Sequence, residues 1–230
     1  MGKAWLKARP DLVEDVQKSL DGAFCNLHLF IVGNRAEIRG SFPVLGADGL
    51  VLDRYSLRIT FPDEYPEALP EVQEVAGRIP RIADRHIFTD SGNCCVLLED
   101  ARWESFPVGA SFRTFLELPV HNYFLGQSLV ERRENWPFDD WSHGGRGIYE
   151  YYSEALHTKD FDVVRRFVGL LALAEAKGHH ECFCGSRSRL RDCCSTVVSV
   201  WRERVPAGVA RRSLGWLQPK ERQPASRRKR

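Results

Sequence analysis

Seven cysteines are the residues of this chain whose chemistry and spacing are most informative. They form a group of four, an adjacent pair and a single residue: Cys182, Cys184, Cys193 and Cys194, then Cys94 and Cys95, then Cys25. Adjacent cysteines and a Cys-x-Cys pair are poorly placed for local disulfides, and an odd number would leave one thiol unpaired in a secreted protein. We therefore expect a reducing, cytoplasmic location, with thiols that bind metal or react.

The elements that must position these thiols follow from hydrophobic periodicity, which predicts an α+β chain with an antiparallel meander sheet flanked by helices. A helix is expected to begin at Pro10, and apolar alternation predicts strands over residues 25–31, from 36 onward and over 55–61. Glycine-containing turns at 33–34 and 46–49 join these strands. Helical patterns follow at 111–132 and 146–176, the second with an apolar stripe at Phe161, Val164, Phe167, Val168 and Leu171.

Charge is distributed unevenly over the 230 residues, although the formal net charge is only +2. Residues 200–230 contain ten Lys and Arg against two Glu, so the rest of the chain is acidic. This balance argues against a nucleic-acid binder as a whole, and leaves nucleic acid or an acidic protein as a partner for the basic end alone. The longest apolar run, residues 168–174, is too short to span a bilayer, and the amino terminus has no apolar signal core, so we expect no membrane partner.

The segment from Phe61 to Val72, FPDEYPEALPEV, resembles the F-P-x-x-Y-P-x-x-x-P-x-V segment of ubiquitin-conjugating enzymes. Its prolines favour a rigid extended path with Tyr65 packed beneath it. Downstream, Gly92 precedes Cys95 in a Gly-x-x-Cys pattern, and Trp103 lies eight residues after Cys95, as in that family. The resemblance covers roughly residues 10–130 and implies the family's fold, with Cys95 rather than Cys94 as the thioester-forming nucleophile.

The chain departs from that family beside the expected nucleophile. His86 is followed by Ile87 and Phe88 instead of Pro and Asn, and the distance from histidine to cysteine is one residue short. The family's asparagine helps to stabilise the oxyanion formed during aminolysis. His86 and Asn93 are our candidate replacements, with Thr89 as a further alternative. Asp90, Glu99 and Asp100 are candidate general bases, none of which the sequence favours.

Similar drift occurs in bacterial relatives of conjugating enzymes found in ubiquitin-like antiphage operons. The resemblance therefore implies a carrier that accepts a ubiquitin-like modifier from an activating enzyme onto Cys95 and passes it to an amine of a protein target. Such a protein would be an acyl (thioester) transferase with a place in antiviral defence. The alternatives are a catalytically silent binding module of the same fold, and a zinc-dependent adaptor whose metal would be bound by the group of four cysteines.

The cysteine group near the carboxyl end resembles the SEC-C motif, C-x-C-G-S-x(6)-C-C, which the sequence matches from Cys182 to Cys194. Four thiolates suit tetrahedral Zn²⁺ with no open position, and such a site is structural rather than catalytic. We expect Cys182, Cys184, Cys193 and Cys194 to be the ligands, with His179 or His180 as possible substitutes. The expected organisation is a conjugating-enzyme-like core at 1–135, a helical extension at 136–177, a zinc module at 178–199 and a flexible basic tail at 200–230.

Overall fold

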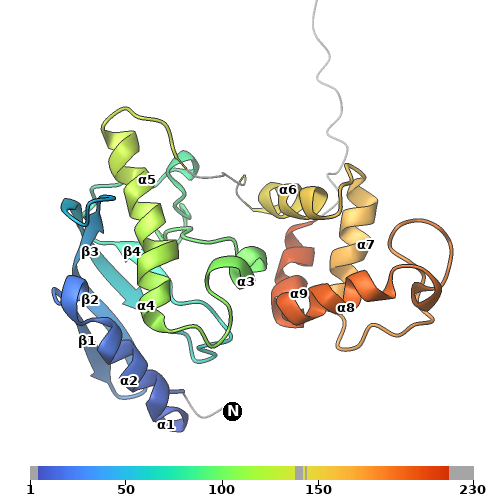
Figure 1. Ribbon diagram of the computed structural model, residues 1–230, viewed down its shortest axis with the longest axis horizontal. Coiled ribbons are helices and arrows are strands. Elements are labelled where there is room, and N and C mark those ends of the chain that lie inside the picture. Colours follow the sequence, from blue (N-terminus) through green and yellow to red (C-terminus); the bar gives the residue numbers. More distant parts are fainter. Residues whose placement is uncertain (1–4, 138–141, 143, 218–230) are drawn as a thin grey trace, which may run out of the picture. The chain divides into compact units, whose positions relative to one another are not determined.

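The computed structural model describes residues 5–137, 142 and 144–217, and Figure 1 shows their helices and strands. The chain folds as two compact units, Met1–Asp140 and Trp141–Arg230. The boundary lies five residues beyond the one expected from the sequence. Most of the expected helical extension, the four-cysteine segment and the described part of the expected tail, up to residue 217, lie in the second unit. No helix among the described residues is long and apolar enough to cross a bilayer.

The first unit contains a four-stranded antiparallel sheet in the order β1-β2-β3-β4, a simple meander. The strands are β1 (Leu27–Val32), β2 (Arg35–Leu45), β3 (Val51–Thr60) and β4 (Glu71–Glu74). In β3, Tyr55, Leu57 and Ile59 are each 2% exposed or less, because alternate side chains of a strand point to the same face. The α+β class, the meander and the three expected strands are confirmed, and β4 is an addition that the sequence did not predict.

Helices cover one face of this sheet (Figure 1). Near the amino end lie α1 (Trp5–Ala8), α2 (Pro10–Ser19) and the short η1 (Gly22–Phe24). Further along, α4 (Phe112–Phe115), the π-helical turn η4 (Leu116–Val120) and α5 (His121–Glu131) follow one another directly. Phe124 of α5 packs on Tyr55 of β3, with ring centroids 4.7 Å apart. The predicted helices over 10–20 and 111–132 are confirmed.

The proline-rich segment connects β3 to β4 and is anchored by aromatic contacts. Tyr65 is 3% exposed, and its ring centroid lies 5.0 Å from those of Trp5 and Phe61. The burial of Tyr65 agrees with the expectation, but the expected extended path is wrong: the Tyr65 N–H donates to the Pro62 carbonyl at 3.1 Å and the Ala68 N–H to the Glu64 carbonyl at 3.0 Å, so residues 63–67 form turns. After β4 come the short helices η2 (Ala83–Arg85), η3 (Glu99–Ala101) and α3 (Arg102–Ser105). Arg102 is buried and donates from Nη1 to the Glu67 carbonyl at 2.8 Å, which ties α3 to the proline-rich segment.

The second unit is helical, with α6 (Gly145–Ala155), α7 (Phe161–Ala172), η5 (Leu190–Asp192), α8 (Ser195–Arg204) and α9 (Ala207–Trp216). Asp160 caps α7 by accepting from the backbone N–H groups of Asp162 and Val163. Four residues of the predicted α7 stripe are fully buried, namely Val164, Phe167, Val168 and Leu171. Phe161 is only half-buried.

The expected flexible tail differs from the structure over residues 200–217. These residues complete α8 and form α9, which packs against α7. Val209, Ala210 and Leu217 are buried there, and Arg165 Nε donates to the Leu217 carbonyl at 3.3 Å. The burial of these apolar side chains therefore orders the segment, although its basic composition suggested disorder. The rest of the predicted tail, residues 218–230, lies outside the described residues.

Candidate functional site

A tight backbone hairpin carries Cys95. Ile87 and Cys94 form an antiparallel bridge, and the Cys95 N–H donates to the His86 carbonyl at 2.7 Å. At the turn, Gly92 has φ of +75° and donates from its N–H to the Phe88 carbonyl at 2.7 Å. This left-handed conformation suits glycine, which has no Cβ. The hairpin therefore holds the backbones of His86 and Cys95 opposite each other.

The two adjacent cysteines have different environments. Cys94 is 6% exposed, and its N–H donates to the Val72 carbonyl of β4 at 2.7 Å. Burial raises the pKa of the Cys94 thiol to about 11, which keeps it protonated near neutral pH. Cys95 is half-buried and is the more accessible of the two. Cys94 is therefore a packing residue of the core, whereas Cys25 is exposed.

His86 is held by an aromatic contact beside the hairpin. Its ring stacks on Trp136 with a centroid distance of 4.7 Å and an interplanar angle of 21°. Its backbone has φ of +51°, a conformation uncommon for a residue with a side chain. The structure therefore brings the His86 carbonyl to Cys95 and places the His86 ring against Trp136.

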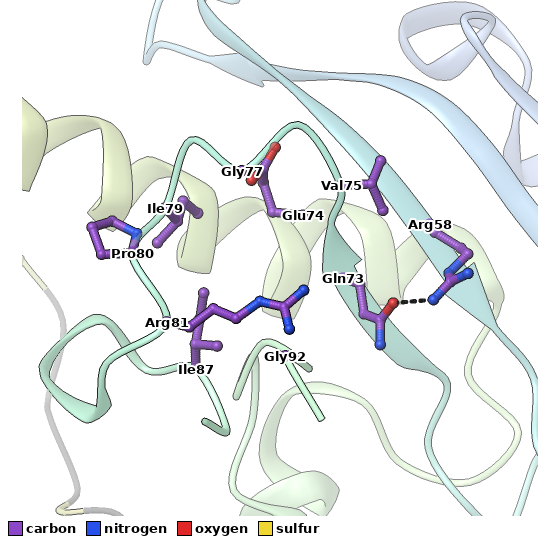
Figure 2. Close-up of a pocket in the computed structure, with 10 residues that line it drawn as sticks. All are labelled: Arg58, Gln73, Glu74, Val75, Gly77, Ile79, Pro80, Arg81, Ile87 and Gly92. Carbon is purple, nitrogen blue, oxygen red and sulfur yellow. Dashed lines mark hydrogen bonds between the residues drawn. The ribbon is translucent and has the colours of Figure 1, made fainter. Parts of the chain in front are cut away.

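Asn93 is directed toward the sheet edge. Its Oδ1 accepts from Gln73 Nε2 at 2.7 Å, and its N–H donates to Ser91 Oγ at 3.2 Å. Gln73 lies on β4 and also accepts from Arg58 through its Oε1, the bond drawn in Figure 2. The Asn93 side chain thus links the hairpin to β4 and, through Gln73, to β3.

The remaining residues singled out near Cys95 occupy short helices and the turn. Trp103 is half-buried on α3, and Asp100 of η3 is 2% exposed. Asp90 accepts from the Ser91 N–H through its own Oδ1 at 2.8 Å. The burial of Asp100 makes it a structural group rather than a group facing an incoming amine.

One positioning group was missed by the sequence analysis. Gln127 of α5 is completely buried; its Nε2 donates to the Arg85 carbonyl at 2.7 Å, and its Oε1 accepts from Arg85 Nε at 2.6 Å. The Tyr123 hydroxyl donates to the same carbonyl at 3.0 Å. These bonds fix the backbone one residue before His86. The available signal was a single amide within the largely apolar run of residues 123–130.

The second candidate site is the group of four cysteines. Their four Sγ atoms all lie within 4.8 Å of one another, and Cys184 Sγ lies 3.4 Å from Cys182 Sγ and 3.6 Å from Cys193 Sγ. Tetrahedral zinc with Zn–S bonds of about 2.3 Å requires sulfur atoms about 3.8 Å apart. The sulfur positions therefore fit one tetrahedral ion, and these residues can hold a metal.

Local backbone geometry explains how the sequence brings these sulfurs together. Glu181 and Arg189 form an antiparallel bridge, and the Cys182 N–H donates to the Ser188 carbonyl at 2.9 Å. Gly185 turns the chain with φ of +82° between the two pairs of cysteines. The other two sulfurs come from the junction of η5 and α8, where Cys194 is the N-cap residue.

The electrostatics of the four thiols differ. The hydroxyl and backbone of Ser186 lower the pKa of Cys184 to about 6, so this thiol ionises more readily than an ordinary cysteine. Burial raises the pKa of Cys182 and of Cys194. Burial makes it costly to ionise these thiols, and a bound cation would offset that cost by stabilising all four thiolates. His179 and His180 contact each other's rings at 4.9 Å and lie outside the metal-sized sulfur group.

Comparison with protein-family models, curated proteins and solved structures finds no significant match. The family resemblances therefore rest on the quoted residues alone. The geometry itself provides two candidate sites, the Cys95 hairpin and the four-cysteine cluster.

Proposed function

We propose that this protein is a ubiquitin-conjugating-like carrier that holds a ubiquitin-like modifier as a thioester on Cys95. The observation that carries the proposal is the contrast between two neighbouring thiols, an accessible Cys95 and a buried Cys94. The cysteine selected by the Gly92 and Trp103 spacings is the accessible one. A carrier needs such a thiol, because both its donor and its acceptor are bulky proteins.

The proposed reaction has two acyl transfers. In the first, the Cys95 thiolate attacks the thioester carbonyl of the modifier on an activating enzyme, and that enzyme's thiolate leaves. In the second, a neutral amine of the target attacks the Cys95 thioester, loses a proton to solvent or a base, and expels the Cys95 thiolate. The product is an amide, and the upstream activating enzyme spends the ATP.

Oxyanion stabilisation is proposed to come from hairpin groups. The family's asparagine is replaced here by Phe88, and Asn93 is the nearest amide along the chain. Its Oδ1 accepts from Gln73, which orients the amide. Asn93 is therefore the proposed donor, and His86 is proposed to shape the hairpin through its stacking on Trp136.

The metal of the four-cysteine cluster is proposed to be structural Zn²⁺. Bound zinc would supply no reaction step, because four sulfur ligands leave no open position. Its proposed contribution is to hold the loop between α7 and α8 as a surface that selects the partner or target. Arg187 and Arg189 are exposed on that loop and provide positive charge there.

The test is a charging assay with a ubiquitin-like modifier, its activating enzyme and ATP. We expect an adduct on non-reducing gels that a thiol reductant removes, lost in Cys95→Ala and retained in Cys94→Ala. Retention in Cys94→Ala also serves as the folding control, because that residue is the buried one. An activating enzyme that charges itself but leaves this protein unmodified would refute the carrier function.

A second candidate is a catalytically silent module that binds modifiers without a covalent bond. It is favoured by the His86 ring, which is stacked on Trp136, and by the replacement of the family's asparagine. This candidate predicts that modifier binding survives in Cys95→Ala with unchanged affinity and that no reductant-sensitive adduct forms.

A further inference from the structure

A pocket of about 470 Å³ lies beside the Cys95 hairpin, on the side of β4. Figure 2 shows its lining, which comes from β3, β4, the segment after β4 and the hairpin. The lining residues are Arg58, Gln73, Glu74, Val75, Gly77, Ile79, Pro80, Arg81, Ile87 and Gly92. This volume lies in the range of sites for small organic ligands.

Two guanidinium groups border this pocket. Arg58 donates from Nη2 to Gln73 Oε1, whereas its Nε is buried without a hydrogen-bond partner. Arg81 reaches across the pocket, and its guanidinium carbon lies 2.8 Å from where a Cβ on Gly92 would be (Figure 2). Among the residues that the structure describes, neither arginine forms an ion pair.

One carboxylate also lines the pocket, and its hydrogen bonds are directed elsewhere. Glu74 is 9% exposed; its two oxygens accept from the backbone N–H groups of Ala76 and Arg78, each at 2.8 Å. It therefore stabilises the turn after β4 and forms no ion pair with either arginine among the described residues. This is notable in the first unit, where residues 1–140 contain 22 Asp and Glu against 15 Lys and Arg.

The rest of the pocket wall is apolar. Ile79 and Ile87 are 4% and 5% exposed, and Pro80 lies next to them in the lining. Val75, on the β4 side, is 54% exposed. A ligand that fits both parts of the pocket combines an anionic head with a hydrocarbon body.

We propose that this pocket binds a small amphipathic carboxylate, with its oxygens between Arg58 and Arg81 and its hydrocarbon part against Ile79 and Ile87. Guanidinium groups form strong, directional hydrogen bonds with carboxylates. Burial of the hydrocarbon part would add apolar stabilisation. The proposal does not depend on whether Cys95 carries a modifier.

The test uses the full chain and three probes: hexanoate, acetate and hexanamide, titrated at constant ionic strength and followed by protein NMR. We expect hexanoate to shift signals of Gln73, Ile79 and Gly92. Acetate should bind at least about tenfold more weakly, because it lacks the four methylene groups that hexanoate buries against the isoleucines. Hexanamide should bind about tenfold more weakly because it lacks the charge.

Variants assign the binding to this pocket. Arg81→Gln should weaken hexanoate binding by about tenfold, because it removes one charged hydrogen-bond donor. The matched control is Arg39→Gln, an exposed arginine of the same sheet that is paired with Glu37 at 2.6 Å. Arg81 is exposed, so its replacement should leave the fold intact even if an Arg58→Gln variant does not fold.

Several outcomes would overturn the proposal. Equal hexanoate affinity in Arg81→Gln and Arg39→Gln would place the binding elsewhere. If hexanamide binds as tightly as hexanoate, the guanidinium charges do not contribute to binding. If inorganic phosphate binds more tightly than hexanoate, the pocket is a simple anion site. That result would exclude the proposed contact of a hydrocarbon group with Ile79 and Ile87.

Discussion

At the scale of single residues, the difference between Cys94 and Cys95 follows from backbone alternation. Neighbouring residues of an extended segment direct their side chains to opposite sides, and the bridge to Ile87 holds Cys94 in that conformation. Cys94 therefore enters the core near Tyr123, and its pKa rises to about 11 through burial. The adjacent thiol of Cys95 keeps greater access to solvent.

This difference predicts selective alkylation. With iodoacetamide at about pH 8, we expect Cys95 to react at least about tenfold faster than Cys94, because reactivity requires an accessible thiolate. Peptide mass spectrometry of a quenched time course measures both rates. Exposed Cys25 is an internal reference for an accessible thiol on the same unit. Equal rates at Cys94 and Cys95 would contradict the assignment.

The raised pKa of Cys94 also predicts a pH dependence of stability. The folded state retains the proton of Cys94 more strongly than the unfolded state, in which a thiol titrates near 9. The resulting contribution to the free energy of unfolding is present below pH 9 and is lost as the pH rises toward about 11. Chemical denaturation across this range should show a steeper loss of stability in the wild type than in Cys94→Ala. Parallel curves would contradict it.

At the scale of elements, α5 holds the chain that leads into the Cys95 hairpin. Gln127 and Tyr123 project from one face of α5, four residues apart, and both donate to the Arg85 carbonyl. That helical spacing places the two side chains together, as expected for positions i and i+4. Arg85 ends η2 and is followed directly by His86, so α5 sets the start of the hairpin.

Replacing Gln127 with Leu should destabilise the first unit. The change leaves Arg85 Nε without its buried acceptor, and an unsatisfied buried group costs about 1–3 kcal/mol. Urea denaturation measures this loss. The control is Gln17→Leu, which changes an exposed glutamine of α2 and should alter stability by less than about 0.5 kcal/mol. Similar effects of the two substitutions would show that the Arg85 contacts are energetically unimportant.

At the scale of the whole molecule, the two units differ in charge. Residues 141–230 contain 18 Lys and Arg against 9 Asp and Glu, whereas acidic residues exceed basic ones in residues 1–140. Several arginines of the second unit donate to backbone carbonyls: Arg202, for example, donates to those of Leu173 at 2.8 Å and Ala174 at 2.7 Å. Some of the basic side chains thus serve as hydrogen-bond donors to carbonyl groups at the carboxyl end of α7.

Metal removal should affect the two units unequally. The cysteine loop packs on α7 through Phe183, whose ring centroid lies 4.8 Å from that of Phe167. We expect a strong chelator to abolish amide-exchange protection around residues 182–194 and to leave β2 and β3 unchanged. Cys184→Ser should reproduce this loss, whereas Cys25→Ser should not. Unchanged protection together with less than about one metal ion per chain would refute the metal site.

The sequence by itself determined the features that depend on local periodicity and spacing. These are the three longer strands, the α7 stripe and the cysteines that can share a metal, because neighbours along the chain largely set each of them. Only the tertiary structure revealed β4, the burial that separates Cys94 from Cys95, and the bonds between Gln127 and Arg85. It also brought Arg58, Arg81 and Gly92 to one pocket. Each of these depends on contacts between distant segments, which local patterns do not encode.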